Sequence, residues 1–135
     1  MRDGFFVLLL VLAAFVLGTI WMHVRFARLG NKRRASGSSY ESFRSKVGSR
    51  ISNEVCRTVY DYFYHHTGHR IPVLASDDLG DVYGIVEDDL VDELRELAVK
   101  CGVAAPTEEE VLQVNTVLEA ALLMESLRQR EAVLA

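Results

Sequence analysis

Cysteine is scarce in this chain, and several patterns that would identify a chemical class are missing. Among 135 residues only Cys56 and Cys101 could form a disulfide, and in a reducing compartment we expect both to be buried small hydrophobes instead. No D-x-D-x-D-G calcium loop occurs, and no nucleophile stands beside a recognisable oxyanion donor. Basic residues interleaved with aromatics are absent from the acidic part of the chain, so nucleic-acid binding is not expected.

The formal charge of -4 conceals an apolar run near the N-terminus. Residues 5–24, FFVLLLVLAAFVLGTIWMHV, carry no formal charge when His23 is neutral. At about 1.5 Å per residue this run is roughly 30 Å long, which matches the hydrocarbon core of a bilayer. In the alternative, a cleaved signal peptide, the apolar region would be only about 7 to 15 residues long and a small-x-small site would follow. No such site follows, so we predict a transmembrane anchor at residues 1–24, with residues 5–24 in the lipid bilayer.

Basic residues are concentrated on the C-terminal side of this run. Arg2 precedes the run and is opposed by Asp3, whereas five basic residues follow it: Arg25, Arg28, Lys32, Arg33 and Arg34. Lys and Arg close to a span are retained in the cytoplasm. We therefore predict a single-pass protein of the cell (inner or plasma) membrane, with its C-terminal domain in the cytoplasm.

Residues 25–39, RFARLGNKRRASGSS, combine basic charge with Gly, Ser and Asn and show no apolar periodicity. This composition indicates a basic juxtamembrane linker. Its basic residues could rest on anionic headgroups, each contributing about 1 kcal/mol near the surface. The alternative is that they serve only to orient the span.

Residues 40–135 are expected to form an acidic helical domain that begins with one long helix. Ser38 with Glu41 fits a capping box, and Gly68 is a natural C-terminal residue. Gly48 weakens the first half of this helix. Residues at three- and four-residue intervals predict one apolar stripe. These are Tyr40, Phe43, Val47, Ile51, Val55, Val59 and Phe63.

Three further helices are expected after an irregular connection over residues 69–86, which has room for one short helical turn. A helix over residues 87–101 has an apolar face and stops at Gly102. Capping boxes at residues 107–110 and 116–119 open a short helix and a final helix with a solvated tail. No sheet is indicated, and about 95 residues suffice for one modest core. We therefore predict an all-α fold with a small orthogonal helical bundle.

Four short motifs within residues 50–127 resemble the acyl carrier protein family. The D-L-G of residues 78–80 looks like the motif that precedes the carrier helix, and DDLVDELRELAVKCGV, residues 88–103, resembles its acidic helix. P-T-E at residues 106–108 and V-N-T-V at residues 114–117 match the entries to its last two helices. The resemblance implies an acyl-carrier-like helical bundle for residues 40–135.

The serine that carries phosphopantetheine in this family is missing here. Alignment from Cys101 places Glu87 at that position, whereas counting forward from the D-L-G motif places Tyr83 there. Neither side chain can replace serine in the phosphodiester, so no phosphopantetheine cofactor is expected. Ser76 is the nearest serine and leaves open a second hypothesis, a genuine acyl or peptidyl carrier with a displaced attachment site.

Acidic residues crowd the segment that contains the helix over residues 87–101. Asp88, Asp92 and Glu96 lie four residues apart, so they share one helix face, offset from the apolar stripe. The resemblance implies a partner-docking surface, and we expect a basic cytoplasmic protein to bind it. A solvated helix face is the alternative. The first hypothesis for the whole chain is thus a non-enzymatic, membrane-tethered interaction module.

Three histidines form the one dense cluster of metal-ligating residue types. His65, His66 and His69 stand in H-H-T-G-H at the expected end of the long helix, where imidazoles could bind zinc. A fourth ligand is lacking nearby, and the helix macrodipole favours such residues at a C-terminus without any metal. No metal site is therefore expected, and a metal-dependent enzyme that uses these histidines and the carboxylates stays as a third hypothesis.

Overall fold

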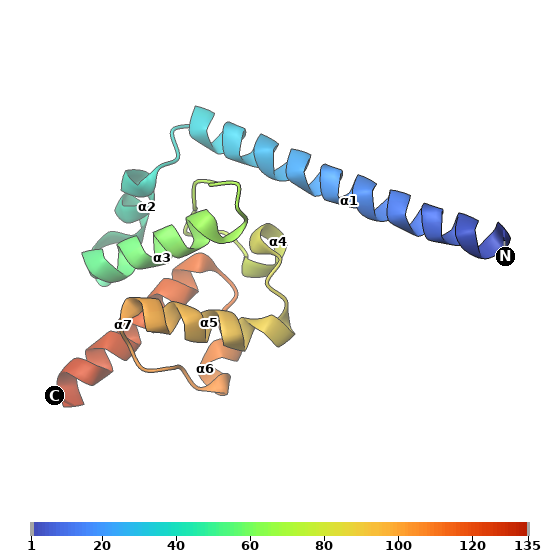
Figure 1. The fold of residues 1–135 in the computed structure, drawn as a ribbon. Helices are drawn as coiled ribbons and strands as arrows, with labels where there is room; N and C mark the ends of the chain where they lie inside the picture. Colours follow the sequence, from blue (N-terminus) through green and yellow to red (C-terminus); the bar gives the residue numbers. More distant parts are fainter. Residues whose placement is uncertain (1, 135) are drawn as a thin grey trace.

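The computed structural model describes residues 2–134, and helices are its only extended regular elements (Figure 1). Within these residues no strand forms, and one isolated bridge joins Asp78 to Thr116. The all-α prediction is confirmed. In chain order the elements are α1 (Arg2–Ala35), α2 (Tyr40–Val47), the 3-10 turn η1 (Gly48–Arg50), α3 (Asn53–His66), α4 (Leu79–Tyr83), α5 (Glu87–Cys101), α6 (Glu108–Leu112) and α7 (Val117–Leu134).

α1 is one uninterrupted helix of 34 residues that extends away from the other helices (Figure 1). Its large apolar side chains between Phe5 and Val24 are exposed. Among the described residues it is the one helix long and apolar enough to cross a membrane, judged by length and composition.

Residues 25–35 continue α1 rather than forming the irregular linker that their composition indicated. Ala, Arg, Leu and Lys are good helix formers, and extending an existing helix avoids the cost of nucleation. Gly30 is buried, and its missing side chain leaves room for the guanidinium of Arg34. The helix ends before Gly37, whose φ of 81° lies in the left-handed region.

α3 is the central helix of the domain that follows. It packs against α2, α5 and α7, while α6 packs against α5. In Figure 1, α3 lies between α1 and α5, and the connection from α3 to α4 lies beside α1. The largest fully buried side chains include Phe43, Ile51, Phe63, Leu94, Leu97 and Met124. One core thus serves the whole domain.

The single long helix expected before Gly68 is wrong, because the chain forms α2 and α3 separately. Gly48 adopts φ 73° and ψ -161°, a region that is essentially restricted to glycine. Ser52 then caps α3 by accepting a hydrogen bond from the amide of Val55. The apolar stripe itself is buried from Phe43 onward. The periodicity therefore identified the inward face correctly, although it missed the break.

The boundaries of the later helices agree with the sequence. α5 has the predicted limits and ends at Gly102, which takes the left-handed conformation. Thr107 and Glu110 form the predicted capping box of α6. The connection after α3 contains one short helix, α4.

The two ends of the domain differ in detail from the prediction. The capping box of α2 consists of Ser39 and Ser42 rather than Ser38 and Glu41. Residues 128–131 are exposed as expected but remain helical, because α7 continues to Leu134.

Candidate functional site

The outer face of α5 carries the three carboxylates expected to bind a partner. Asp88, Asp92 and Glu96 are exposed, and their spacing places them on one side of the helix. None of them forms an ion pair with a described residue. The opposite face of α5 is buried through Leu90, Leu94, Leu97 and Ala98. The structure thus brings the three carboxylates together on an accessible surface.

The surroundings of this face are also acidic. Eighteen of the nineteen acidic residues follow Ala35, against nine of the fifteen basic residues. Helix α6, which packs against α5, adds exposed Glu108 and Glu109. A surface dominated by one sign of charge raises the local concentration of oppositely charged molecules. The part of the chain after Ala35 therefore carries an excess of negative charge, although exposed Arg95 and Lys100 also lie on α5.

An open cavity of about 530 Å³ lies between α3 and α5 and joins two groups of residues singled out in the sequence. It is lined by Thr58, Asp61, Tyr62, His65, His66, Glu93, Glu96 and Lys100. The cavity thus reaches from Glu96 to His65 and His66 at the end of α3.

Glu93 is the most constrained carboxylate in this cavity. It accepts a hydrogen bond from the Tyr62 hydroxyl, and its Oε2 lies 3.8 Å from Nδ1 of His66. Burial, together with the hydrogen bond to Glu93, raises the pKa of Tyr62 far above its ordinary value. Tyr62 therefore stays protonated and acts as a donor, and Glu93 packs the two helices together rather than facing outward with Asp88 and Asp92.

The three histidines do not converge on one point. His66 faces Glu93 and lies 6.1 Å from the ring of Tyr83, whereas His69 contacts His23 of α1. His65 is exposed beside the cavity. Among the described residues no group of three or more His, Cys, Asp or Glu side chains could hold a metal ion.

The residues at the expected serine position have distinct environments. Tyr83 is buried, and its hydroxyl donates a hydrogen bond of 2.9 Å to Oδ2 of Asp77. Glu87 is exposed as the first residue of α5, beside a hollow of about 340 Å³ that the D-L-G residues 78–80 also line. Ser76 is exposed in the connection before α4. Of these three side chains only Ser76 offers a free hydroxyl to solvent.

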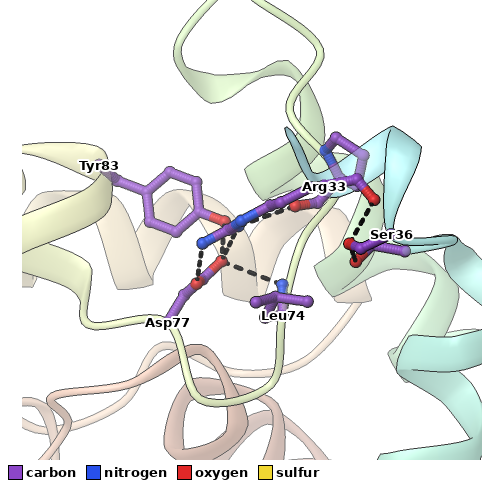
Figure 2. A network of polar contacts seen from close by, with 7 residues as sticks. Arg33, Ser36, Leu74, Asp77 and Tyr83 are labelled. Carbon is purple, nitrogen blue, oxygen red and sulfur yellow. Dashed lines mark hydrogen bonds and ion pairs between the residues drawn. The ribbon is translucent and has the colours of Figure 1, made fainter. Parts of the chain in front are cut away.

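A buried polar network, which sequence reasoning missed, joins α1 to the domain (Figure 2). Arg33 donates from Nη1 and Nη2 to the two carboxylate oxygens of Asp77, at 2.7 and 2.6 Å. Its Nη1 also donates to the carbonyl of Pro72 at 2.8 Å. Tyr83 and the amide of Leu74 donate to Oδ2 of the same carboxylate. We call these five residues the Arg33 clasp.

The clasp is nearly excluded from water, since Arg33 is 8% and Asp77 4% exposed. A bidentate guanidinium and carboxylate pair is among the strongest polar contacts, and Oδ2 of Asp77 also accepts from Tyr83 and from the amide of Leu74. No buried side-chain polar atom among the described residues lacks a partner. Burial, and then the charge of Asp77, raises the pKa of Tyr83 well above its usual range. Tyr83 therefore stays protonated and donates its hydroxyl hydrogen to Asp77.

Two further contacts hold α1 against the connection. Arg34 donates from Nη1 to the carbonyl of Arg70 at 3.0 Å. Nδ1 of His23 lies 3.0 Å from Nε2 of His69, and the Phe26 ring packs 5.4 Å from the same imidazole. Arg33 is thus not available to lipid headgroups, because its charge is used inside the protein. Neither of the two roles expected from the sequence, headgroup binding and orientation of the span, explains why Arg33 is buried.

The two cysteines do not form a disulfide. Cys56 is buried and Cys101 half-buried, and both are free thiols. Burial raises the pKa of both thiols, that of Cys101 to about 11. Both therefore remain protonated near neutral pH, and Cys56 is the buried small hydrophobe that the sequence predicted.

Comparison of the chain with known protein families, with curated proteins and with solved structures gives no match.

Proposed function

We propose that this chain is a non-enzymatic, single-pass membrane protein whose acyl-carrier-like domain presents the acidic face of α5 to a basic cytoplasmic partner. The observation that carries the proposal is the set of exposed carboxylates of Asp88, Asp92 and Glu96, which have no ion-pair partner among the described residues. Opposite charges on two proteins speed their association, whereas partners that carry the same sign of charge are repelled.

The anchor is supported by the exposure of the apolar half of α1. Large side chains such as Phe15, which is 73% exposed, face outward all along residues 5–24. A helix that is apolar all round requires an apolar environment, and a bilayer supplies one of matching thickness. A cleaved signal sequence passes the same test of length and composition. The continuity of the helix into the Arg33 clasp favours an anchor, because cleavage after the apolar run would cut through a single ordered helix.

The acyl-carrier-like architecture is supported by the order of the helices and by the position of the D-L-G motif. Asp78 caps α4 by accepting hydrogen bonds from the amides of Gly80 and Asp81, immediately before the acidic helix. The attachment serine is replaced by an exposed glutamate or a buried tyrosine. A domain that keeps the acidic recognition helix and has lost the serine retains the means to bind partners without carrying a thioester.

A salt titration tests the proposed mode of binding. Membranes that contain the 135-residue chain are first equilibrated at increasing ionic strength and then crosslinked. The proteins crosslinked to the chain are isolated and quantified at each salt concentration. Because the screening length falls from about 10 Å at 0.1 M to about 3 Å at 1 M, partner recovery should fall steeply with salt. Recovery that does not change with salt would exclude docking through exposed opposite charges.

The orientation is tested by protease treatment of intact cells. A C-terminal tag should stay intact until the membrane is permeabilised, because the positive charge that follows the span keeps this side in the cytoplasm. Digestion of the tag in intact cells would contradict the proposal.

A second candidate function is favoured by the exposure of Ser76. If the chain is a carrier with a displaced attachment site, coexpression with a phosphopantetheinyl transferase increases its mass by one phosphopantetheine group. The Ser76→Ala variant should then show no such increase. We expect no mass gain, because Ser76 precedes α4 instead of opening the acidic helix. Intact-mass measurement of both proteins decides between the two functions.

A further inference from the structure

The turn after α3, residues 67–70 with the sequence T-G-H-R, lies against α1 and carries positive charge. We propose that this turn binds the headgroups of anionic phospholipids and gives the chain a second contact with the bilayer. The proposal rests on the membrane anchoring proposed above, and adds the orientation of the domain and the lipid chemistry that it requires.

The depth of the turn follows from its contacts with α1. The ring of His69 meets the ring of His23 edge-on and lies tilted against the ring of Phe26, with ring centroids 4.9 and 5.4 Å apart. His23 is next to the last residue of the apolar run, where the guanidinium of Arg25 covers the Trp21 ring. Trp and Arg at the end of a span mark the headgroup level of a bilayer. His69 is therefore held at the height of the headgroups rather than deep in the cytoplasm.

The turn cannot swing away from this height while the Arg33 clasp is closed. Arg33 holds the carbonyl of Pro72, two residues beyond the turn, and Arg34 holds the carbonyl of Arg70. Arg70 has a φ of 51° and is the one non-glycine residue with positive φ in the described part of the chain. Such strain persists only where surrounding contacts impose it, and it clusters at binding sites. Here the contacts come from the membrane helix itself.

The charges at this level suit anionic phosphates. Arg25, Arg28 and Arg70 are exposed, and none of them forms an ion pair with a described residue. In Figure 1, α3, the connection that follows it and α4 lie between α1 and α5. Basic groups beside a span are attracted to anionic lipids, and this attraction decays within a Debye length. A turn fixed at headgroup height lies within that range.

The experiment measures how close the turn lies to the headgroups. The full chain carries Cys101→Ser to remove the partly accessible thiol, and one fluorophore is attached at Thr67→Cys. A second protein carries the fluorophore at Ser126→Cys, an exposed position on α7. Both are reconstituted into vesicles of phosphatidylcholine and phosphatidylglycerol that contain a lipid with a nitroxide on its headgroup. Flotation of the vesicles reports the anchor independently, and circular dichroism confirms that each variant folds.

We expect several-fold stronger quenching at position 67 than at position 126. Arg33→Gln opens the clasp from the α1 side, so quenching at position 67 should fall toward the value at position 126 while the chain still floats. Lys32→Gln is the matched control, since it removes one charge from the neighbouring exposed residue and leaves the clasp intact. Arg70→Glu, or vesicles of phosphatidylcholine alone, should also weaken quenching at position 67.

The outcomes separate the two proposals. A chain that floats but shows equal quenching at the two positions contradicts the headgroup contact and leaves the anchor standing. Quenching that does not respond to Arg33→Gln, Arg70→Glu or lipid charge contradicts it as well. A chain that does not float overturns both, because the turn then has no bilayer to reach.

Discussion

A single buried carboxylate, that of Asp77, connects three parts of the chain. It accepts hydrogen bonds from Arg33 of α1, from Tyr83 of α4 and from the amide of Leu74. A buried charge that loses its partner keeps its desolvation penalty, so each member of the network requires the others. Because Asp77 binds Arg33, the folded domain fixes the direction of α1, and α1 is not joined to the domain by a flexible tether alone.

Substitution of Asp77 tests this dependence. In a fragment of residues 25–135, which keeps the clasp and omits the apolar run of residues 5–24, Asp77→Asn should lower the free energy of unfolding by about 3 to 5 kcal/mol. Tyr83→Phe removes one hydrogen bond and should cost about 0.5 to 1.5 kcal/mol. Urea denaturation measures both. Asp61→Asn, which breaks an exposed pair with Arg57, is the control and should cost at most about 1 kcal/mol. Equal losses for the two asparagine variants would refute the clasp.

Glu125 is a second buried carboxylate, and its stabilising effect should depend on pH. The hydrogen bond from Arg128 lowers its pKa to about 2, and the amide and hydroxyl of Ser52 also donate to it. A pKa that is depressed by folding adds stability above the unfolded value, near 4.3, and this stability disappears as pH falls toward 2.

Glu125→Gln should therefore destabilise the fragment at pH 7 by about 1.5 to 3 kcal/mol, the range for hydrogen bonds to charged groups. The difference in the free energy of unfolding between this variant and the wild type should shrink between pH 4.5 and pH 3. Urea denaturation at each pH measures this difference. Exposed Glu96→Gln should change the stability by no more than about 0.5 kcal/mol at pH 7. A difference for Glu125→Gln that stays constant across this range would contradict the assignment.

At the scale of elements, α5 owes its position to one apolar face. Leu94 is 1% exposed, and Leu94→Ala should destabilise the fold by about 2 to 5 kcal/mol through lost burial and the remaining cavity. Val99 on the same helix is 78% exposed, so Val99→Ala should change the stability by no more than about 0.5 kcal/mol. Thermal or urea unfolding of both variants measures the contrast. A loss below 2 kcal/mol for Leu94→Ala would count against the inward face.

The break between α2 and α3 makes a second prediction at this scale. Gly48 occupies a backbone region that other residues adopt only with strain of about 1 to 3 kcal/mol, so Gly48→Ala should destabilise the domain by that amount. If residues 40–66 instead formed one continuous helix, the same change would stabilise it by roughly 1 kcal/mol. The sign of the change in urea denaturation therefore decides between the two structures.

These elements show what could be predicted from the sequence. The limits of α5 followed from its apolar spacing and from Gly102, because both act locally. The break at Gly48 was missed because a glycine in a helical pattern does not reveal whether its φ is positive. The ion pair of Arg33 with Asp77 could not be predicted, since its partners are separated by 44 residues and charge alone does not indicate which of several arginines is buried.

At the scale of the whole molecule, an apolar and basic surface and an acidic surface lie on different parts of the chain. The apolar and basic α1 lies on one side of α3, and the acidic α5 lies on the other (Figure 1). The Arg33 clasp fixes one surface relative to the other. In the proposed membrane orientation, a partner bound to α5 would therefore be held at a defined distance and direction from the bilayer.

The central claim is that the outer face of α5 binds a basic partner, and reversal of its charges tests it most directly. Asp88→Lys, Asp92→Lys and Glu96→Lys are combined in the full-length chain, and the proteins crosslinked to it in membranes are quantified against the wild type. The control combines Glu41→Lys with Glu54→Lys. Both control residues are exposed, and each, like Asp88, lies in the first turn of its helix, so the control loses at least as much favourable dipole interaction as the triple reversal.

We predict that the triple reversal abolishes recovery of the partner while circular dichroism and membrane flotation stay unchanged, because the substituted side chains lie on the solvent side of α5. The control should recover the partner as the wild type does. Undiminished recovery with the triple reversal would contradict the account and leave this face of α5 as a solvated surface.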